Sequence, residues 1–282
     1  MSEVKMAEKW YQSAATQEYL VYFSVILLSS VLLLSPVAFP LDITQSTIDF
    51  VQAIRSIPDG GIMLWDESNF VTGYYTQNQI ALYRLFFDQA KQRGVKIIFI
   101  SSCVDGPMAG AMINKQLEIQ DTTGLTYGVD YVNLGWLPGF EIVLSAIAKD
   151  IQTVTSADAY GTSISEIPLM QGLKTEDIDL FAFNCGVSCD PWMRQWVPLH
   201  KPLLMTGGYS LIAQAQGYIQ AGSITAYLNG SRGYVEMERI TGYMTMQTAL
   251  FEATNIMGPF SVLLVILTNV WYMLRKRRKR EA

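Results

Sequence analysis

Three acidic residues, Asp66, Glu67 and Asp105, are the side chains in this sequence best suited to bind a hard cation or to act as general acid and base. Asp66 and Glu67 directly follow the apolar run 60–65, and Asp105 follows the run 95–100 closely. A simpler interpretation is that these carboxylates cap the helices that come next. The sequence alone leaves both interpretations open.

Small and amide residues follow the other apolar runs of the chain. They are Gly135, Gly139, Asn184, Gly207 and Gly208. If the runs are parallel strands, these residues and the three carboxylates lie at one edge of the sheet, where open α/β sheets bind ligands. Loops between strands and helices also need polar and turn-forming residues simply to fold. We therefore predict a ligand-binding crevice made from these eight residues.

The segment 133–141, NLGWLPGFE, predicts a turn from a strand into a helix. Pro138 suits the first turn of a helix, and Gly135 and Gly139 permit a tight reversal. Glu141 in the first helical turn would repel an anion. A neutral or cationic ligand is therefore expected at this edge rather than a phosphate.

The sequence contains no recognisable catalytic set. The single histidine, His200, precedes the strand predicted at 202–206 and so lies at the opposite edge of the sheet. Lys115 and Lys149 have no motif for a serine–lysine pair, and the glycine-rich phosphate-binding fingerprints are missing. The sequence favours a non-enzymatic binding protein and specifies no cofactor. The alternative is a hydrolase that uses Asp66, Asp105 or nearby Ser and Cys residues.

The three cysteines of the sequence are Cys103, Cys185 and Cys189. Cys185 and Cys189 could close a small disulfide loop if the domain is outside the cell, or they could be two separate thiols, because spacing does not fix geometry. A metal centre is not expected, since the cysteines form one pair plus a distant residue.

Apolar, β-branched runs alternate with segments of helical periodicity, which is typical of a parallel sheet covered on both faces. We predict an α/β fold with an open, mostly parallel sheet of five or six strands. The expected strands are 60–66, 95–100, 130–134, 178–184, 202–206 and 222–228. The expected helices are 77–93, 107–120, 138–151, 191–199, 207–220 and one from 231 onward. Residues 153–176 are expected to be an irregular excursion over a sheet edge.

Two uncharged stretches, 20–39 and 258–274, predict transmembrane helices at the two ends of the chain. The flanks of the first stretch favour an uncleaved anchor over a signal peptide. Six basic residues, 275–280, follow the second stretch and predict cytoplasmic termini. The expected order is a cytoplasmic or interfacial helix (1–19), span 20–39, an extracytoplasmic domain (40–240), a juxtamembrane helix (241–257), span 258–274 and a basic tail (275–282).

Charge is distributed unevenly along the chain. Residues 40–257 hold 21 acidic and 12 basic side chains, a net charge of −9. Nucleic acid needs a basic surface, so it is not an expected partner. The expected partners are the lipid bilayer, a small ligand or a protein, and a second copy of the chain. Thr268 and Asn269 in the second span could hydrogen-bond to the first span or to such a second copy. A structural assembly subunit is a further alternative.

Several stretches within residues 60–240 resemble a family of prokaryotic membrane-anchored α/β proteins with a Rossmann-like fold. They are 127–139 (YGVDYVNLGWLPG), 158–161 (DAYG), 167–170 (IPLM), 222–230 (GSITAYLNG) and 236–238 (EME). The resemblance implies the same architecture, with an anchored α/β domain. It implies no activity and no catalytic residue.

Overall fold

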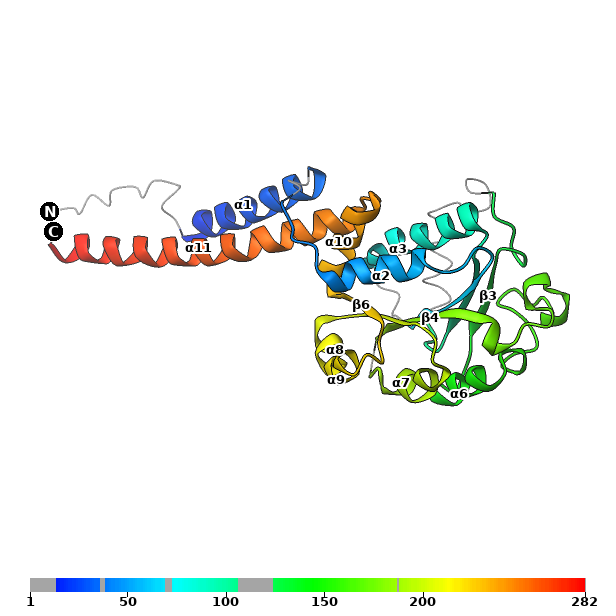
Figure 1. Cartoon of the computed structure of the whole chain (residues 1–282). Helices are drawn as coiled ribbons and strands as arrows, with labels where there is room; N and C mark the ends of the chain where they lie inside the picture. Colours follow the sequence, from blue (N-terminus) through cyan, green and yellow to red (C-terminus); the bar gives the residue numbers. More distant parts are fainter. Residues whose placement is uncertain (1–13, 36–38, 69–72, 106–123, 187, 282) are drawn as a thin grey trace. The chain divides into compact units, whose positions relative to one another are not determined.

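The computed structural model describes residues 14–35, 39–68, 73–105, 124–186 and 188–281 (Figure 1). The chain divides into two compact units. One is residues 41–247, and the other combines residues 1–40 with residues 248–282. The helix predicted at 107–120 lies outside the described residues.

The unit 41–247 is built on a six-stranded sheet in which all neighbouring strands are parallel. The strands are β1 (Ile62–Asp66), β2 (Lys96–Ser101), β3 (Tyr131–Trp136), β4 (Ile178–Cys185), β5 (Leu203–Gly207) and β6 (Ala226–Asn229). Their order across the sheet is β3-β2-β1-β4-β5-β6. The predicted α/β fold with an open parallel sheet is confirmed, and six strands lie within the predicted number.

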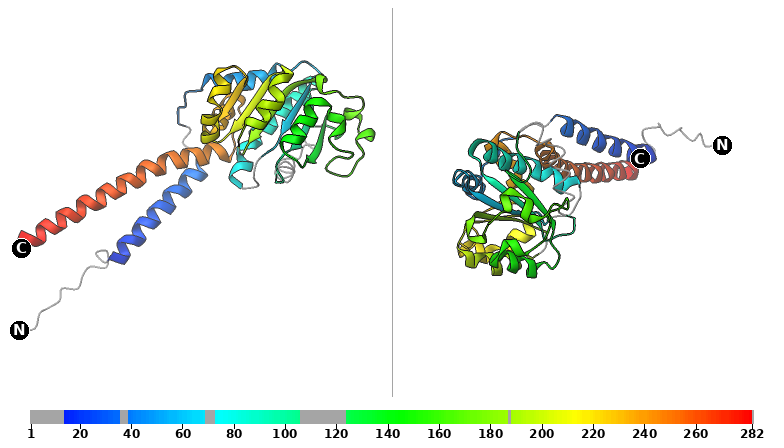
Figure 2. Two further views of the ribbon diagram at one scale, coloured as in Figure 1. Left: turned by 90° about the horizontal axis from the view of Figure 1, so that it is seen from below. Right: turned by 90° about the vertical axis from the view of Figure 1, so that its right-hand side faces the viewer.

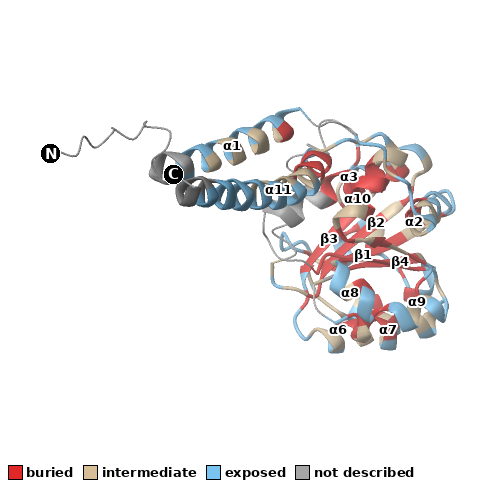
Figure 3. Ribbon diagram, turned by 90° about the vertical axis from the view of Figure 1, so that its left-hand side faces the viewer, coloured by how far each residue is buried: buried red, intermediate tan, exposed pale blue. Residues whose placement is uncertain are grey.

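Helices cover both faces of the sheet (Figure 1, Figure 2). On one face lie α2 (Gln45–Arg55), α3 (Gly73–Arg93) and α10 (Gly230–Thr241). On the other lie α6 (Glu141–Lys149), α7 (Asp190–Trp196), α8 (Tyr209–Gln214) and α9 (Gln216–Gln220). Successive strand residues point to opposite faces. Trp65 therefore joins the core under α3, while Leu64 joins the core under α7. The strands are accordingly buried throughout most of their length (Figure 3).

Some helices differ from the predictions. The α2 helix was not among the predicted elements, and its buried residues Phe50, Val51 and Ile54 pack into the core. The helix predicted at 207–220 is two helices that meet at Ala215, and a short 3-10 helix, Val197–Leu199, follows α7. The helix from residue 231 ends at Gly242, which adopts a left-handed conformation (φ +79°). Glycine ends helices in this way because it lacks a Cβ.

The excursion 153–176 packs along the edge strand β3, as expected. Ala159 N donates to Asn133 O at 2.9 Å. Gly135 lies within β3 at φ +77°, and a Cβ at this position would be 3.2 Å from the Ala159 Cβ. Gly135 was predicted to form the turn after the strand. It instead serves the close approach of the excursion, while Gly139 (φ +110°) makes the turn into α6.

The other unit contains α1 (Ala14–Leu34) and most of α11 (Met246–Glu281). Among the described residues, one helix is long and apolar enough to cross a membrane. It is Met246–Leu274, with 29 residues and a mean hydropathy of 1.7. The apolar part of α1, Glu18–Leu34, is shorter. Length and composition thus support the second predicted span, whereas the first, predicted at 20–39, ends as a helix at Leu34.

Candidate functional site

The strand order reverses between β1 and β4. Strands β2 and β3 lie on one side of β1, and strands β4, β5 and β6 lie on the other. This is the point at which open α/β sheets form a crevice beyond the carboxyl ends of their strands. Asp66 ends β1, Glu67 follows it, and Asn184 lies near the end of β4. The predicted site residues of β1 and β4 are therefore neighbours at this reversal.

Asp66 is fully buried and accepts hydrogen bonds on both carboxylate oxygens. Its Oδ1 accepts from Ser102 N at 2.9 Å and from Ser68 Oγ at 2.8 Å. Its Oδ2 accepts from Ser102 Oγ at 2.8 Å and from Trp192 Nε1 at 2.7 Å. The Trp192 ring stacks on Phe183 of β4, with ring centroids 4.8 Å apart. Asp66 therefore ties the ends of β1 and β2 to α7.

Burial raises the pKa of Asp66, although the hydrogen bonds from Ser102, Ser68 and Trp192 oppose that shift. Removing an ion from water is costly, and donors aimed at both oxygens offset part of the cost. All four donors come from the protein itself. The arrangement thus positions the loops after β1 and β2, and none of its four donors is a backbone N–H of a helix, as the capping interpretation would require.

Glu67 is also buried, but it accepts from a different set of side chains. Its Oε2 accepts from Trp65 Nε1 and from Tyr83 Oη, each at 2.9 Å. Its Oε1 accepts from Gln79 Nε2 at 2.9 Å and, over a longer 3.5 Å, from Asn184 Nδ2. We call these five residues the Glu67 cluster. They come from β1, the residue that follows it, α3 and β4.

Burial raises the pKa of Glu67 to about 7, against the lowering effect of the hydrogen bonds from Trp65, Gln79, Tyr83 and Asn184. All of those donors are neutral groups, so they stabilise the carboxylate less than a cation would. Glu67 can therefore gain or lose a proton near neutral pH, which is a property often found in functional sites.

The two adjacent carboxylates lie on opposite faces of the sheet edge. Asp66 contacts Trp192 of α7, whereas Glu67 contacts Tyr83 of α3. The alternation of side chains along an extended strand explains the separation. They form two networks, and only the network of Glu67 includes the predicted site residue Asn184.

The remaining predicted residues lie in separate places. Gly207 ends β5 and Gly208 precedes α8, both at the carboxyl edge. Gly135 contacts the excursion over β3, and Gly139 lies in the turn before α6. Asp105 is partly buried and adjoins residues outside the described part of the chain.

Sequence reasoning missed the donors that surround the two carboxylates. They are Trp65, Ser68, Gln79, Tyr83, Ser102 and Trp192. The one usable signal was helical periodicity, because Gln79 and Tyr83 are four residues apart and share one face of α3.

The cysteines and the histidine contribute little to this geometry. Cys103 is a partly buried free thiol and Cys189 a buried one. The side chain of Cys185 lies outside the described residues, so its pairing with Cys189 stays a prediction. His200 follows the 3-10 helix Val197–Leu199, at the amino end of β5. Within the described ranges, no group of three or more His, Cys, Asp or Glu residues could hold a metal ion.

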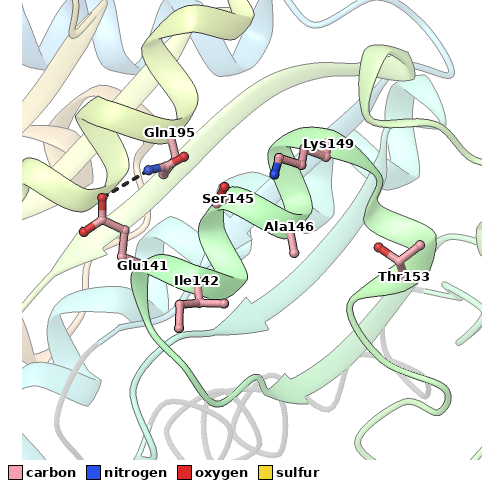
Figure 4. Close-up of a pocket in the computed structure, with 7 residues that line it drawn as sticks. All are labelled: Glu141, Ile142, Ser145, Ala146, Lys149, Thr153 and Gln195. Atoms are coloured by element: carbon pink, nitrogen blue, oxygen red, sulfur yellow. Dashed lines mark hydrogen bonds between the residues drawn. The ribbon is translucent and has the colours of Figure 1, made fainter.

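A surface hollow of about 500 Å³ lies on the outer side of α6 (Figure 4). Glu141, Ile142, Ser145, Ala146 and Lys149 of α6 line it together with Thr153 and Gln195. Glu141 accepts from Gln195 at 3.0 Å and from both Nε and Nη2 of Arg194 at 2.7 Å. The Arg194 hydrogen bonds lower the pKa of Glu141 to about 2. This hollow is a second place where a ligand could contact the domain.

Comparison with known proteins found no protein-family model that matches the chain and no curated protein similar to it.

Proposed function

We propose that this chain is a membrane-anchored protein whose α/β domain binds a small ligand at the carboxyl edge of the sheet, between β1 and β4. The observation that carries the proposal is the Glu67 cluster. Side chains from β1, α3 and β4 converge there on one buried carboxyl group, at the point where the strand order reverses. Ligand sites in this fold class combine such a position with a few convergent polar groups.

The ligand is neutral or cationic. The described residues at this edge include the carboxyl groups of Asp66 and Glu67, and the donors that contact these two groups are uncharged. Placing a phosphate or another anion beside two buried carboxylates would add repulsion in a region of low dielectric. Glu67 is the better placed of the two to contact a ligand, because one of its four donors, Asn184 Nδ2, is a long 3.5 Å away, whereas all four donors on Asp66 lie within 2.9 Å.

A binding role is favoured over the hydrolase alternative because the serine hydroxyl groups at this edge are already engaged in hydrogen bonds within the protein. A hydrolytic carboxylate or serine must reach the substrate, and a serine also needs a base beside it. Ser102 Oγ donates to Asp66, and Ser68 Oγ lies within hydrogen-bonding distance of Ser102 Oγ. Both hydroxyl groups thus serve the loop network around Asp66.

A ligand screen on the full chain in detergent tests this proposal. Neutral and cationic metabolites are screened for an increase in melting temperature, first with the wild type and then with Asn184→Ala and Glu141→Ala. We expect Asn184→Ala to abolish the stabilisation and Glu141→Ala, in the surface hollow on α6, to keep it. The opposite pattern would move the site to α6. If no compound stabilises the wild type, the ligand-binding proposal is wrong.

We further propose that residues 20–39 and 258–274 both cross the membrane and that the termini are cytoplasmic, which makes the domain 40–240 extracytoplasmic. The basic run 275–280 supports this orientation. Tyr160 is 64% exposed, so a Tyr160→Cys variant offers an accessible thiol. In intact cells an impermeant maleimide should label this variant above the wild-type level. Protection of the introduced thiol, together with labelling of a cysteine added at the C-terminus, would reverse the orientation.

A homo-oligomer is a separate proposal. The donors of Thr268 and Asn269 do not by themselves require it, because each has a partner within its own helix. Thr268 Oγ1 donates to Leu264 O at 2.8 Å and Asn269 Nδ2 to Val265 O at 2.7 Å. Size-exclusion chromatography with light scattering in detergent tests it. A monomer at all concentrations would exclude the oligomer.

A further inference from the structure

The Glu67 cluster contains an unmatched acceptor beside its carboxyl group. Gln79 is 1% exposed, and its Nε2 donates to Glu67 Oε1 at 2.9 Å. The other atom of the same amide, Gln79 Oε1, has no hydrogen-bond partner among the described residues. A buried acceptor without a partner destabilises the folded state, and such groups are uncommon in folded proteins.

Among the described residues, the carboxyl group of Glu67 has no cationic partner. Its donors are an indole, a phenol and two amides. By contrast, the buried carboxylate of Glu236 accepts from Arg232 Nε at 2.7 Å. Among the described residues no lysine, arginine or histidine forms an ion pair with Glu67. The cluster therefore combines an uncompensated acidic group with a nearby oxygen that needs a donor.

The two oxygens, Glu67 Oε1 and Gln79 Oε1, define the chemistry of a ligand group that could contact both. A group that satisfies both must donate hydrogen bonds and be favoured by negative charge. An ammonium group has three N–H donors and a positive charge. Ca²⁺ instead takes about six to eight oxygen ligands, and the described residues hold no group of three or more His, Cys, Asp or Glu side chains that could bind a metal ion.

We propose that the Glu67 cluster binds the primary ammonium group of a small amine, which donates to Glu67 Oε1 and to Gln79 Oε1. This inference rests on the proposed ligand-binding function and specifies its ligand class. The elevated pKa of Glu67 is consistent with it, since a carboxyl group without a cation beside it holds its proton more tightly.

The first test measures the melting temperature of the full chain in detergent with ethylammonium chloride. Tetramethylammonium chloride at equal concentration is the control, because it has the same charge and no N–H donor. We expect the wild type to melt about 3–6 °C higher when ethylammonium is in tenfold excess over its Kd. Equal shifts with the two salts, or no shift with ethylammonium, would refute the ammonium site.

Two variants locate the effect. Glu67→Gln has nearly the same shape and removes the charge, and Gln79→Met removes the unpaired oxygen. We expect both to lose the ethylammonium shift, while Glu236→Gln, which changes a buried carboxylate elsewhere, keeps it. A Glu67→Gln variant that still responds fully would refute the inference. If neutral compounds stabilise the wild type and amines do not, the proposed function stands and the ammonium site is wrong.

The pH dependence separates an amine from a proton or a water molecule as the occupant. An ammonium group competes with the proton on Glu67, so its affinity should rise about tenfold per pH unit below the pKa of Glu67 and level off above it. Affinity for ethylammonium that is constant from about pH 5 to 8 would contradict direct binding to Glu67. Among the described residues, Glu67 raises the pKa of Tyr83 and of Tyr234, and neither phenol ionises in this range because burial raises both pKa values further.

Discussion

Replacing Glu67 with glutamine should change how the stability of the domain depends on pH. Burial raises the pKa of Glu67 from 4.5 to about 7. Each unit corresponds to about 1.4 kcal/mol, so ionising Glu67 in the folded state costs about 3 kcal/mol relative to the unfolded chain. Between these two pH values the folded state binds more protons than the unfolded state. The free energy of unfolding therefore falls as the pH rises through this window.

Glutamine should occupy the same space and keep the main contacts. Its carbonyl can accept from Trp65 and Tyr83. Its amide can donate to the Oε1 of Gln79 once the Gln79 amide turns over, because Gln79 Nε2 is the atom that faces Glu67 Oε1. Because glutamine does not titrate, the unfolding free energy of the variant should not show this fall as the pH rises. Between about pH 4.5 and about pH 8, we expect the unfolding free energy of Glu67→Gln to increase by about 3 kcal/mol relative to that of the wild type.

Guanidinium titrations of the two full-length proteins in detergent, followed by tryptophan fluorescence, measure this difference. Trp65 is fully buried and bonded to Glu67, so it reports on the relevant region. The neighbouring Asp66 has a raised pKa in both proteins, and its contribution cancels in the comparison. Curves that run parallel across the whole pH range would show that Glu67 titrates normally, and the reasoning from burial would then be wrong.

Two further substitutions test the packing of the domain. Gly135→Ala should lower stability by about 1–3 kcal/mol, because its φ is +77° and the new Cβ would lie 3.2 Å from the Ala159 Cβ. The control is Gly172→Ala, where φ is +69° but no atom lies near the new Cβ, and it should lower the melting temperature less. Glu236→Gln should destabilise the domain at neutral pH. Burial raises the pKa of Glu236, but hydrogen bonds from Thr44, Thr47 and Arg232 outweigh that effect and lower the pKa. The deficit of this variant in a denaturant titration should vanish as the pH falls through the lowered pKa, and a deficit independent of pH would contradict this assignment.

The sheet could be predicted well because its signal is local. The β-branched run 95–100 and the buried runs at 60–66 and 178–184 show their burial on both faces directly in their composition. The α2 helix was not predicted, although its buried residues Phe50, Val51 and Ile54 recur at helical spacing. The pairing of Gly135 with Ala159 could not be predicted, since it depends on how the excursion returns to β3.

The site was predicted in part. The rule for open sheets placed Asp66, Glu67 and Asn184 at one edge, where the structure has them. Their contacts depend on the order of the strands, because Asn184 reaches Glu67 only when β4 lies beside β1. Separating Asp66 from Glu67 was possible from the sequence, since adjacent residues of an extended strand point to opposite faces.

The α10 helix joins three features along about one turn of its length. Burial raises the pKa of Tyr234, and the nearby charge of Glu67 adds to that shift. Glu236 accepts from the backbone and hydroxyl of Thr44, near the start of the α/β unit, and Glu238 accepts from Thr245, near its end. The chain therefore enters and leaves this unit through residues held by the same helix. A mechanical load applied to the chain before Thr44 or after Thr245 would therefore act on α10, close to Tyr234.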